Sequence, residues 1–367
     1  MHILHITEAL GGGVLNVVQQ VATRQTEAGL SVTVAHSVRF DTPDELVLSE
    51  MFPSPIRRVI VPMATNVAPY QDMKAVWRLV RVIRKLNPDV IHLHSSKAGV
   101  LGRIACRLAG KRERCFYSPH GFSFLRKDVS GFKRALFVFF ERVAGRFGGT
   151  TIACSPSELQ LALNTARHRG AVLVENSMPA GFSGEATGSA GTDFVVSTSG
   201  RICFPKNPSA FCDLALAFRN DSVSFLWIGD GELRAQLSSG GSLPDNLKIT
   251  GWVSRGEAID YLRGSDLFVM TSLWEGMPLA LIEAQALGLA AVVPDVEGCK
   301  DVVIDGVTGF VCADVADMKR KISLLKSDAE LRKRMGKEAR EQAFKRFSPE
   351  RMHQELMAVY GLPCGDR

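Results

Sequence analysis

Two carboxylates, Glu275 and Glu283, belong to the stretch SDLFVMTSLWEGMPLALIEAQALG at residues 265–288. The pattern predicts a buried strand at 267–271, a short loop, and a helix at 278–288. Backbone amides at the start of such a helix lack partners and the helix dipole is positive there, so a phosphate is a favourable ligand. The two carboxylates could then bind different parts of one ligand. A nucleotide sugar, with phosphates and several hydroxyl groups, fits this arrangement.

Two cations follow another predicted strand, at 193–199. Arg201 comes directly after the turn at Gly200, and Lys206 lies where the next helix begins. A planar guanidinium and an ammonium point charge could together bind a diphosphate. Spacing alone leaves open that both are ordinary solvated surface cations.

Two further turns follow predicted strands in the same half of the chain. The turn 229–231 is Gly-Asp-Gly, and the turn at Gly251 continues into Trp252 and Val253. Each turn by itself carries little information. Because the carboxyl ends of parallel strands meet at one edge of a sheet, we expect both turns to lie along the edge that carries the candidate residues.

Short apolar runs alternate with helical patterns along the chain. This alternation predicts an α/β fold with parallel sheets covered by helices, in which ligands bind in the loops after strands. In the first half, the predicted strands are 2–7, 31–36, 57–61, 89–93, 114–118, 150–154 and 171–174, and the predicted helices are 14–28, 73–86, 98–109, 131–147 and 156–165. In the second half, the predicted strands are 193–199, 223–228, 246–250, 266–271, 290–293 and 309–311.

The length of 367 residues favours two domains over one core. The segment 179–192 is rich in Gly, Ala and Ser and predicts a linker. An N-terminal domain would span 1–178 and a C-terminal domain 193–348, with the ligand in the cleft between them. The helical run that opens 349–367 would cross back to the first domain.

Two loops of the first half carry weaker candidates. Gly12 and Gly13 precede a helix and could let a backbone approach a phosphate, although a flexible turn explains them as well. His92 and His94 point to the same side of their strand by alternation. Zinc would need a third ligand that the sequence does not supply, so we expect no metal site and interpret both histidines as supports of the cleft wall.

His120 stands beside Gly121, just after the predicted strand at 114–118. A lone histidine is most often structural. A histidine at the carboxyl end of a strand, in a fold that binds ligands at that edge, is a better candidate for the active site.

The composition, with 46% apolar and 22% charged residues, is that of a soluble globular protein. The N-terminus predicts a strand followed by glycines, not a signal peptide, and no apolar run approaches the roughly 20 residues of a transmembrane helix. The eight cysteines form no CxxC pair. This favours reduced thiols in a cytoplasmic protein over a zinc site or a disulfide framework.

The formal charge of +6 is unevenly distributed, because residues 97–146 hold twelve Lys and Arg against three Asp and Glu. Within this region, 122–147 interleaves cations with phenylalanines. A helical stripe could simply be core: Phe132, Leu136, Phe140, Val143 and Phe147. The excess of aromatic residues beside arginines favours an interfacial helix on anionic lipid, and not nucleic-acid binding.

Several motifs, taken in order, resemble the C-terminal domain of the family 4 retaining glycosyltransferases of the GT-B fold: GRICFPKN, IGDGEL, ITGWV, SLWEGMPLALIEAQALG and VIDGVTGFV. The GGG turn, DVIHLHSSKAGVLGRIA and SPHGFSF are similar to the acceptor domain of that family. The resemblance covers nearly the whole chain, and the Glu-x7-Glu element is its most specific part. It implies two Rossmann-like domains facing a central cleft.

The resemblance implies a role for each candidate by position. Glu275 would bind hydroxyls of the donor sugar, Glu283 the ribose hydroxyls, and His120 the donor sugar near the reacting carbon. Arg201 and Lys206 would neutralise the leaving diphosphate. The other contacts would come from Gly12, Gly13, Gly276, Met277 and Leu279 around the diphosphate, and from Trp252 and Val253 beside the base.

The resemblance also implies the reaction: transfer from a nucleotide-diphosphate sugar, which we expect to be UDP-linked, to a polysaccharide or lipid-linked oligosaccharide. The reaction would take place at the cytoplasmic membrane face and without metal or cofactor. Cations beside the departing phosphate would stabilise the transition state more than the ground state. In the family's retaining scheme the phosphate takes the acceptor's proton, so Glu275 positions the sugar. The alternative is an epimerase of the UDP-GlcNAc 2-epimerase type, which would release nucleotide without an acceptor product.

Two stretches depart from the family's pattern. Residues 175–178 read Glu-Asn-Ser-Met where the family usually has Asn-Gly-Ile/Val-Asp, at the expected hinge. Residues 297–301 read Glu-Gly-Cys-Lys-Asp in place of the more usual Gly-Gly-x-x-Glu. We therefore expect contacts near that second turn to differ from the family's.

Overall fold

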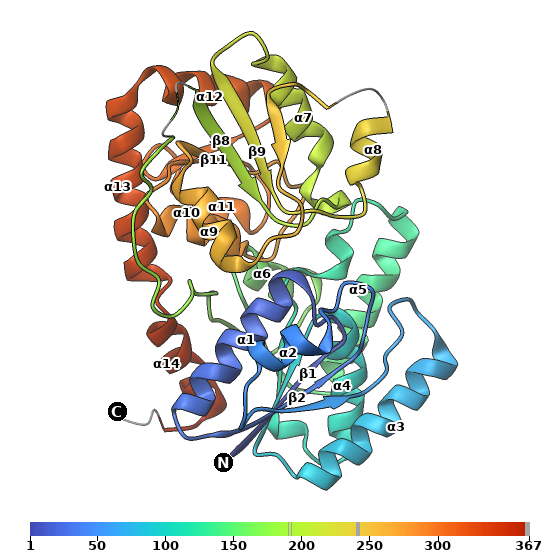
Figure 1. Ribbon diagram of the computed structural model, residues 1–367. Helices are drawn as coiled ribbons and strands as arrows, with labels where there is room; N and C mark the ends of the chain where they lie inside the picture. Colours follow the sequence, from blue (N-terminus) through green and yellow to red (C-terminus); the bar gives the residue numbers. More distant parts are fainter. Residues whose placement is uncertain (190, 192, 240–242, 364–367) are drawn as a thin grey trace. The chain divides into compact units, whose positions relative to one another are not determined.

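The computed structural model describes the chain except for residues 190, 192, 240–242 and 364–367. It separates into two compact units (Figure 1). The first unit contains residues 1–176 together with 349–367, and the second contains residues 177–348.

The first unit is built on a seven-stranded parallel sheet with the order β3-β2-β1-β4-β5-β6-β7. In this sheet β1 pairs with both β2 and β4, so the N-terminal strand lies in its interior. The strands are β1 (His2–Thr7), β2 (Ser31–His36), β3 (Arg57–Ile60), β4 (Val90–His94), β5 (Cys115–Ser118), β6 (Thr150–Ala153) and β7 (Ala171–Leu173).

The helices of the first unit are α1 (Gly12–Glu27), α2 (Glu45–Met51), α3 (Pro69–Leu86), α4 (Ser96–Leu108), α5 (Gly131–Arg146), α6 (Pro156–Gln160) and α14 (Pro349–Tyr360). Helix α4 packs against both α3 and α5. Helix α14 packs against α1, and its Tyr360 hydroxyl lies 2.7 Å from Nδ1 of His92. Helix α14 is therefore part of the first unit.

The second unit is built on a six-stranded parallel sheet with the order β10-β9-β8-β11-β12-β13. Its strands are β8 (Phe194–Ser199), β9 (Val223–Ile228), β10 (Leu247–Ile249), β11 (Leu267–Val269), β12 (Ala291–Pro294) and β13 (Gly309–Cys312). Its helices are α7 (Pro208–Ala217), α8 (Arg234–Ser239), α9 (Arg255–Arg263), α10 (Leu279–Ala286), α11 (Cys299–Val302), α12 (Val315–Ser327) and α13 (Ala329–Arg346).

The observed strands lie where the apolar runs predict them, within two residues at each end. Helix α2 was not predicted; Asp44 caps it by accepting a hydrogen bond from Val47 N at 3.0 Å. Part of the predicted linker lies along the second unit, where Ala186 N donates to the Leu287 carbonyl at 2.7 Å. Residues 190 and 192 of that predicted linker lie outside the described residues.

Helix α5 differs from the core interpretation of its phenylalanines. Its buried residues are Glu141 and Ala144, whereas Phe132 is 80% exposed. Glu141 accepts a hydrogen bond from the Tyr117 hydroxyl at 2.9 Å. Phe137 packs against the core although it lies off the expected stripe. A buried polar group thus anchors this helix, so the predicted stripe is not its core face.

Among the described residues, none of the helices combines the length and the apolar character needed to cross a membrane.

Candidate active site

Glu275 and Lys206 form an ion pair at the carboxyl edge of the second sheet. Glu275 lies in the loop between β11 and α10, and its Oε1 is 2.7 Å from Nζ of Lys206. The Ser272 hydroxyl donates to the same oxygen at 2.8 Å. Burial works against the charge of Lys206, but the neighbouring Glu275 carboxylate outweighs it and raises the pKa of Lys206. Two charged groups predicted separately are therefore in contact.

The loop before α11 holds Glu275 in place. Glu275 N donates to the Glu297 carbonyl at 3.2 Å. Gly298 has φ +82°, and a Cβ on it would lie 2.8 Å from Glu275 Cβ and 2.7 Å from the Gly276 carbonyl oxygen. Only glycine allows this approach without a shift. The departure from the family's pattern at 297–301 thus lies directly against the candidate glutamate.

Glu283 forms the second ion pair of this edge. It lies within α10, is 7% exposed, and its Oε1 is 2.8 Å from Nε of Arg255. Burial raises the pKa of Glu283, and the Arg255 guanidinium opposes that rise. Arg255 begins α9 after the Ser254 cap. The sequence analysis did not identify Arg255. Its position just after the turn at Trp252 and Val253 could have indicated it as a candidate site residue.

Met277 and Leu279 flank Pro278, the residue that precedes the first turn of α10. Both side chains are buried, so backbone and not side chain would face a ligand here. Gly276 follows Glu275 in the same loop. The predicted helix start is therefore confirmed to within one residue.

Three more strand ends complete this edge of the second sheet. Arg201 follows β8, and its Nε lies 3.6 Å from Oε2 of Glu232. Gly229, after β9, pairs with Gly251, after β10, in an antiparallel bridge. A Cβ on Gly229 would lie 2.4 Å from the Gly200 carbonyl oxygen, so these turns are tightly packed. The expectation that they lie along one edge is confirmed.

Trp252 and Val253 follow that bridge. Trp252 is 70% exposed and Val253 is half-buried. An exposed indole beside an ion-paired edge is a surface on which a planar base can stack. The structure thus leaves the predicted base-binding residues accessible.

Gly12 and Gly13 belong to the first unit, at the start of α1. Gly12 has φ +54°, a conformation that favours glycine, and a Cβ on either residue would meet nothing within 4 Å. The Gly11 cap position makes no side-chain hydrogen bond, and the first turn contains no acidic residue. The Asp41 carboxylate lies close to this helix start, since a Cβ on Gly11 would be 3.1 Å from Asp41 Oδ2.

His120 has φ +53°, which is uncommon for a residue other than glycine. Its Nε2 lies 2.9 Å from Nδ1 of His94. Burial lowers the pKa of His120 to about 4. The following residue, Gly121, donates its N–H to Oε1 of the buried Glu158 at 2.6 Å. An unusual backbone conformation held by a buried carboxylate is typical of a functional position.

The premise that no third ligand stands near His92 and His94 is wrong. Because β1 and β4 pair in parallel, His5 lies directly beside His92. The three buried histidines place ligand atoms within 4.8 Å of one another. Sequence reasoning missed His5 because the pairing of β1 with β4 joins positions more than eighty residues apart.

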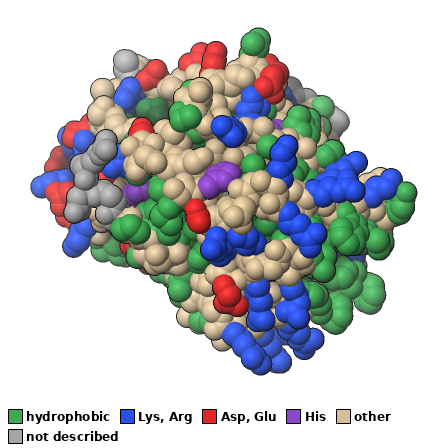
Figure 2. All heavy atoms as spheres, turned by 90° about the horizontal axis from the view of Figure 1, so that it is seen from below, with side chains coloured by type: hydrophobic (Ala, Val, Ile, Leu, Met, Phe, Trp, Pro, Cys, Tyr) green, Lys and Arg blue, Asp and Glu red, His purple; other side chains and the backbone are tan. Residues whose placement is uncertain are grey.

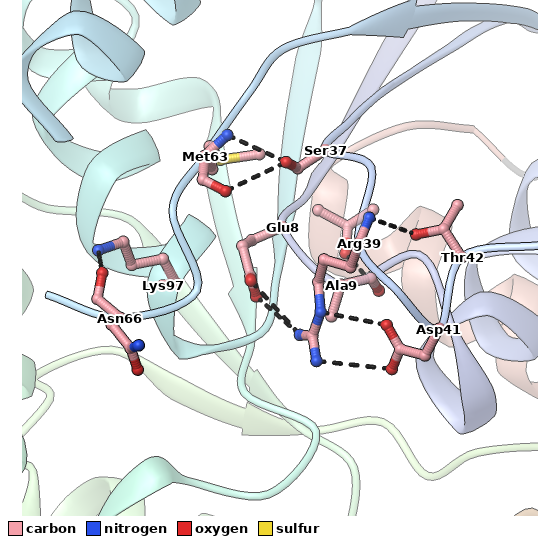
Figure 3. Close-up of polar contacts among 10 residues, drawn as sticks. Glu8, Ala9, Ser37, Arg39, Asp41, Thr42, Met63, Asn66 and Lys97 are labelled. Atoms are coloured by element: carbon pink, nitrogen blue, oxygen red, sulfur yellow. Dashed lines mark hydrogen bonds and ion pairs between the residues drawn. The ribbon is translucent and has the colours of Figure 1, made fainter. Parts of the chain in front are cut away.

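A second charged cluster lies at the carboxyl edge of the first sheet and was also missed (Figure 3). Glu8 directly follows β1 and is buried; its Oε2 lies 3.3 Å from Nη1 of Arg39. Arg39 also pairs with Asp41, at 3.1 Å, and Lys97 pairs with Asp72 at 2.7 Å. Burial raises the pKa of Glu8, and the Arg39 charge opposes that rise. The sequence could have indicated Glu8 as a candidate site residue by its position just after a predicted strand.

Two family models match the chain: Glycosyltransferase Family 4 over residues 11–172, and Glycosyl transferases group 1 over residues 183–342. The UDP-Gal:alpha-D-GlcNAc-diphosphoundecaprenol alpha-1,3-galactosyltransferase of Escherichia coli is 33% identical over 290 residues, which cover 72% of this chain and 73% of the relative. The chain belongs to glycosyltransferase family 4. The capsular polysaccharide glycosyltransferase CapM of Staphylococcus aureus, another relative, is 24% identical over 82% of this chain and 84% of its own length.

Solved structures share the fold of this chain. Anabaena HepE in complex with UDP-glucose has a TM-score of 0.77 and 20% identity, over 98% of this chain and 99% of that chain. TarM of S. aureus, in a complex that includes UDP, has a TM-score of 0.77 and 13% identity, also over 98% and 99%. At these identities the likeness shows the fold alone, two Rossmann-like units of the GT-B type.

The protein is therefore a glycosyltransferase, and membership of family 4 favours this activity over the epimerase alternative. Both matched models together extend over most of the chain, as the motif resemblance implied. The charged pairs of the second unit and the histidines His92, His94 and His120 lie in the regions that these two models match, whereas His5 precedes the first of them.

Proposed function

We propose that this family 4 enzyme transfers a hexose from a UDP-sugar to a sugar carried on a lipid diphosphate, with retention of anomeric configuration and without a metal ion. The observation that carries the proposal is the pair Lys206–Glu275 beside α10, with Glu283 in the same helix. The E. coli relative acts, by its name, with UDP-galactose on a GlcNAc-diphosphoundecaprenol. A sugar linked to a lipid diphosphate is therefore the acceptor class that we propose for this enzyme.

Different charged residues of the second unit would bind different parts of the donor. Arg201 and Lys206 would neutralise the diphosphate, and Lys206 would exchange its Glu275 partner for a phosphate oxygen. Glu275, released from Lys206, would accept hydrogen bonds from hydroxyls of the donor sugar. Glu283 would accept those of the ribose, with Arg255 holding the carboxylate in position. Charge-assisted hydrogen bonds of this kind are stronger than neutral ones.

The leaving diphosphate gains negative charge as the bond to the sugar carbon breaks. Two cations and the amides of Met277 and Leu279 at the start of α10 would stabilise that charge in the transition state more than in the ground state. In a retaining transfer the acceptor hydroxyl attacks from the same face, and a phosphate oxygen takes its proton. His120, with a neutral imidazole, would contact the donor sugar by a hydrogen bond.

The lipid-linked acceptor suggests that the first unit contacts an anionic membrane. On α5, Phe132 and Phe139 are exposed among Lys133, Arg134 and other cations, and the buried Glu141 is its acidic residue. An interfacial helix combines exposed aromatic side chains with cations in this way.

Helix α3 extends the same kind of surface, which sequence reasoning missed. Tyr70, Met73 and Trp77 are exposed at helical spacing, and Lys74 and Arg78 stand beside them. Figure 2 shows Lys and Arg side chains gathered beside hydrophobic ones on the face seen from below. Since α4 packs between α3 and α5, the two helices belong to one layer.

The donor and acceptor are tested by nucleotide release. The purified enzyme is incubated with UDP-galactose, UDP-glucose, UDP-GlcNAc or UDP-GalNAc, with and without a short-chain GlcNAc-diphospholipid. We expect acceptor-dependent UDP release with one donor, an α-linked product by NMR, and an unchanged rate in EDTA. Release without acceptor would favour an epimerase. If no donor turns over, and Glu275→Ala and Arg201→Ala bind donors like the parent, the proposal fails.

Membrane contact is tested by co-sedimentation with vesicles of phosphatidylglycerol or phosphatidylcholine. We expect binding to the anionic vesicles only, and a loss of about a hundredfold or more in Phe132→Ser/Phe139→Ser and in Met73→Ser/Trp77→Ser, since each large apolar side chain contributes about 1.5–3 kcal/mol when it is buried. Phe344→Ser, at an exposed position of the second unit, is the matched control. Phe137 is unsuitable because it packs on the core. Unchanged binding by both double variants refutes the interfacial surface.

A further inference from the structure

Three histidines of the first unit form a continuous line of hydrogen bonds from α1 to the loop after β5. His5 Nδ1 lies 2.9 Å from His94 Nε2, and His94 Nδ1 lies 2.9 Å from His120 Nε2. At the inner end, His5 Nε2 lies 2.8 Å from Oε1 of Gln25 on α1. The line therefore connects a fully buried amide with the histidine that the proposed mechanism places against the donor sugar.

The imidazoles in this line are neutral. Burial lowers the pKa of His5 and that of His120 to about 4, and the pKa of His94 falls well below its ordinary value for the same reason. A neutral imidazole donates from one ring nitrogen and accepts at the other. In a line of neutral imidazoles, all hydrogen bonds are consequently donated in the same direction. A group that fixes the proton position of the histidine at one end therefore fixes the tautomer of every histidine in the line.

Gln25 fixes that direction, because a carbonyl oxygen can only accept. With Oε1 facing His5, the His5 proton must be on Nε2, so His5 Nδ1 accepts from His94 Nε2–H. By the same step His94 Nδ1 accepts from His120 Nε2–H. His120 Nδ1 is then left with a lone pair.

A second branch favours this orientation of the amide. The Tyr360 hydroxyl lies 2.7 Å from His92 Nδ1, and His92 Nε2 lies 2.9 Å from the Ser118 hydroxyl. Burial raises the pKa of Tyr360, and the nearby Gln25 amide opposes that rise. The amide nitrogen of Gln25 makes no close hydrogen bond within the described chain, so this weaker interaction with Tyr360 is the one available to it.

We propose that Gln25 is a positioning residue that, through His5 and His94, holds His120 with its proton on Nε2, so that Nδ1 accepts a hydrogen bond from a hydroxyl of the bound sugar. The inference rests on the proposed role of His120. The adjoining cavity of about 20 Å³ admits a water but no sugar ring. The line therefore acts by orienting His120 and not by binding sugar itself.

The same residues could be taken for a metal site, since His5, His92 and His94 approach within 4.8 Å. Every ring nitrogen of these three histidines is already engaged: by Gln25, by Tyr360, by Ser118, by His120 or by one another. A metal ion would have to replace the His5–His94 hydrogen bond in a fully buried place. The fully paired network thus favours the orienting role.

The test uses the full-length enzyme labelled with ¹⁵N on histidine. Ring-nitrogen shifts distinguish the two tautomers, and His120→Gln identifies the signal of His120 among the eight histidines. Without substrate, we expect the proton on Nε2 in His5, His94 and His120. In Gln25→Met, which keeps the volume but no hydrogen-bonding group, His120 should populate both tautomers. Gln19→Met, on the same helix but outside the network, is the matched control.

Activity is the second readout. Loss of a partner that fixes an imidazole tautomer typically costs tenfold or more, so kcat of Gln25→Met should fall about tenfold with little change in donor KM. A wild-type His120 protonated on Nδ1 overturns the proposal, as does an unchanged tautomer in Gln25→Met or stoichiometric zinc in the purified protein. Once His120→Gln has identified the His120 signal, the wild-type spectrum needs no turnover, so it tests this inference even if the transfer reaction itself is not found.

Discussion

The two sheets bring their candidate residues to equivalent edges by different physical means. The edge of the second sheet uses ionised groups in pairs, Lys206 with Glu275 and Arg255 with Glu283. The first unit contains all eight histidines of the chain, and the imidazoles of its central line are neutral, with His5 and His94 buried and His120 half-buried.

The difference lies in what burial permits. Ions held by opposite charges can exchange those partners for a charged ligand, since the ligand brings the replacement charge. Imidazoles that are withdrawn from water lose their charge, so they can only direct hydrogen bonds. One unit is thus suited to bind and neutralise a diphosphate, and the other to present an oriented, uncharged hydrogen-bonding group.

Removal of a positive charge from the second unit should have the largest effect and tests the contrast between charged pairs and neutral imidazoles. In Lys206→Met, kcat should fall by about 10²–10³, the range for loss of one group that stabilises transition-state charge. Lys206→Arg keeps the charge and should retain more activity. UDP release with acceptor is the measurement, and a loss below threefold in Lys206→Met contradicts the assignment.

The two glutamates of the second unit separate nucleotide binding from sugar transfer. Glu283→Ala should weaken UDP binding about 10–100-fold, with or without an attached sugar, because a charged hydrogen-bond acceptor for the ribose is lost. Glu275→Ala should leave the Kd of free UDP within about twofold while transfer falls strongly, since only the sugar loses a partner. Isothermal titration with UDP and with the UDP-sugar distinguishes them. Equal weakening of UDP binding by both variants would show that the two carboxylates are not divided in this way.

The loop that supports Glu275 allows a smaller perturbation of the same edge. In Gly298→Ala the new Cβ would approach Glu275 Cβ to 2.8 Å, so Glu275 must move. We expect transfer to fall about tenfold, since small displacements of positioning groups cost this much or more. Gly306→Ala is the control, because Gly306 also has a positive φ of +72° but open space around its Cβ. Similar losses in both variants would mean that backbone strain, and not displacement of Glu275, is responsible.

The smallest expected effect concerns stability: the unfolding transitions of the two units should depend differently on pH. Buried histidines of the first unit, with the pKa of His5 and that of His120 lowered to about 4, gain protons on unfolding at any pH between about 4 and 6.5. The unfolded state then binds more protons, so stability must fall as pH falls through this window. Between pH 7 and pH 5, the calorimetric transition of the first unit should drop by about 5 °C or more. The second unit contains no histidine, so its transition should move less; an equal shift of both excludes the histidines as the cause.

The strands and the family were accessible from the sequence. Each buried strand of a parallel sheet is a continuous apolar run, and the turn after it carries the ligand-binding residues, so 267–271 and Glu275 could be placed without coordinates. Local chemistry also determined the helix after Pro278, because a proline and a following apolar stripe specify a helix start.

Pairing between distant segments needed the tertiary structure. Nothing local in Lys206 indicates Glu275 as its partner, and nothing in Glu283 indicates Arg255, because these contacts depend on which strands adjoin in the sheet. The same holds for α5, where the aromatic stripe suggested core and the buried anchor is Glu141.

The histidines give the clearest division between the two kinds of information. The sequence determined that His92 and His94 share one face of a strand, since side chains alternate along any strand. Only the parallel pairing of β1 with β4 placed His5 beside them, and only the packing of α1 and α14 added Gln25 and Tyr360. The physical reason is that alternation is a local property of extended backbone, whereas register and helix packing are set by burial of the whole unit.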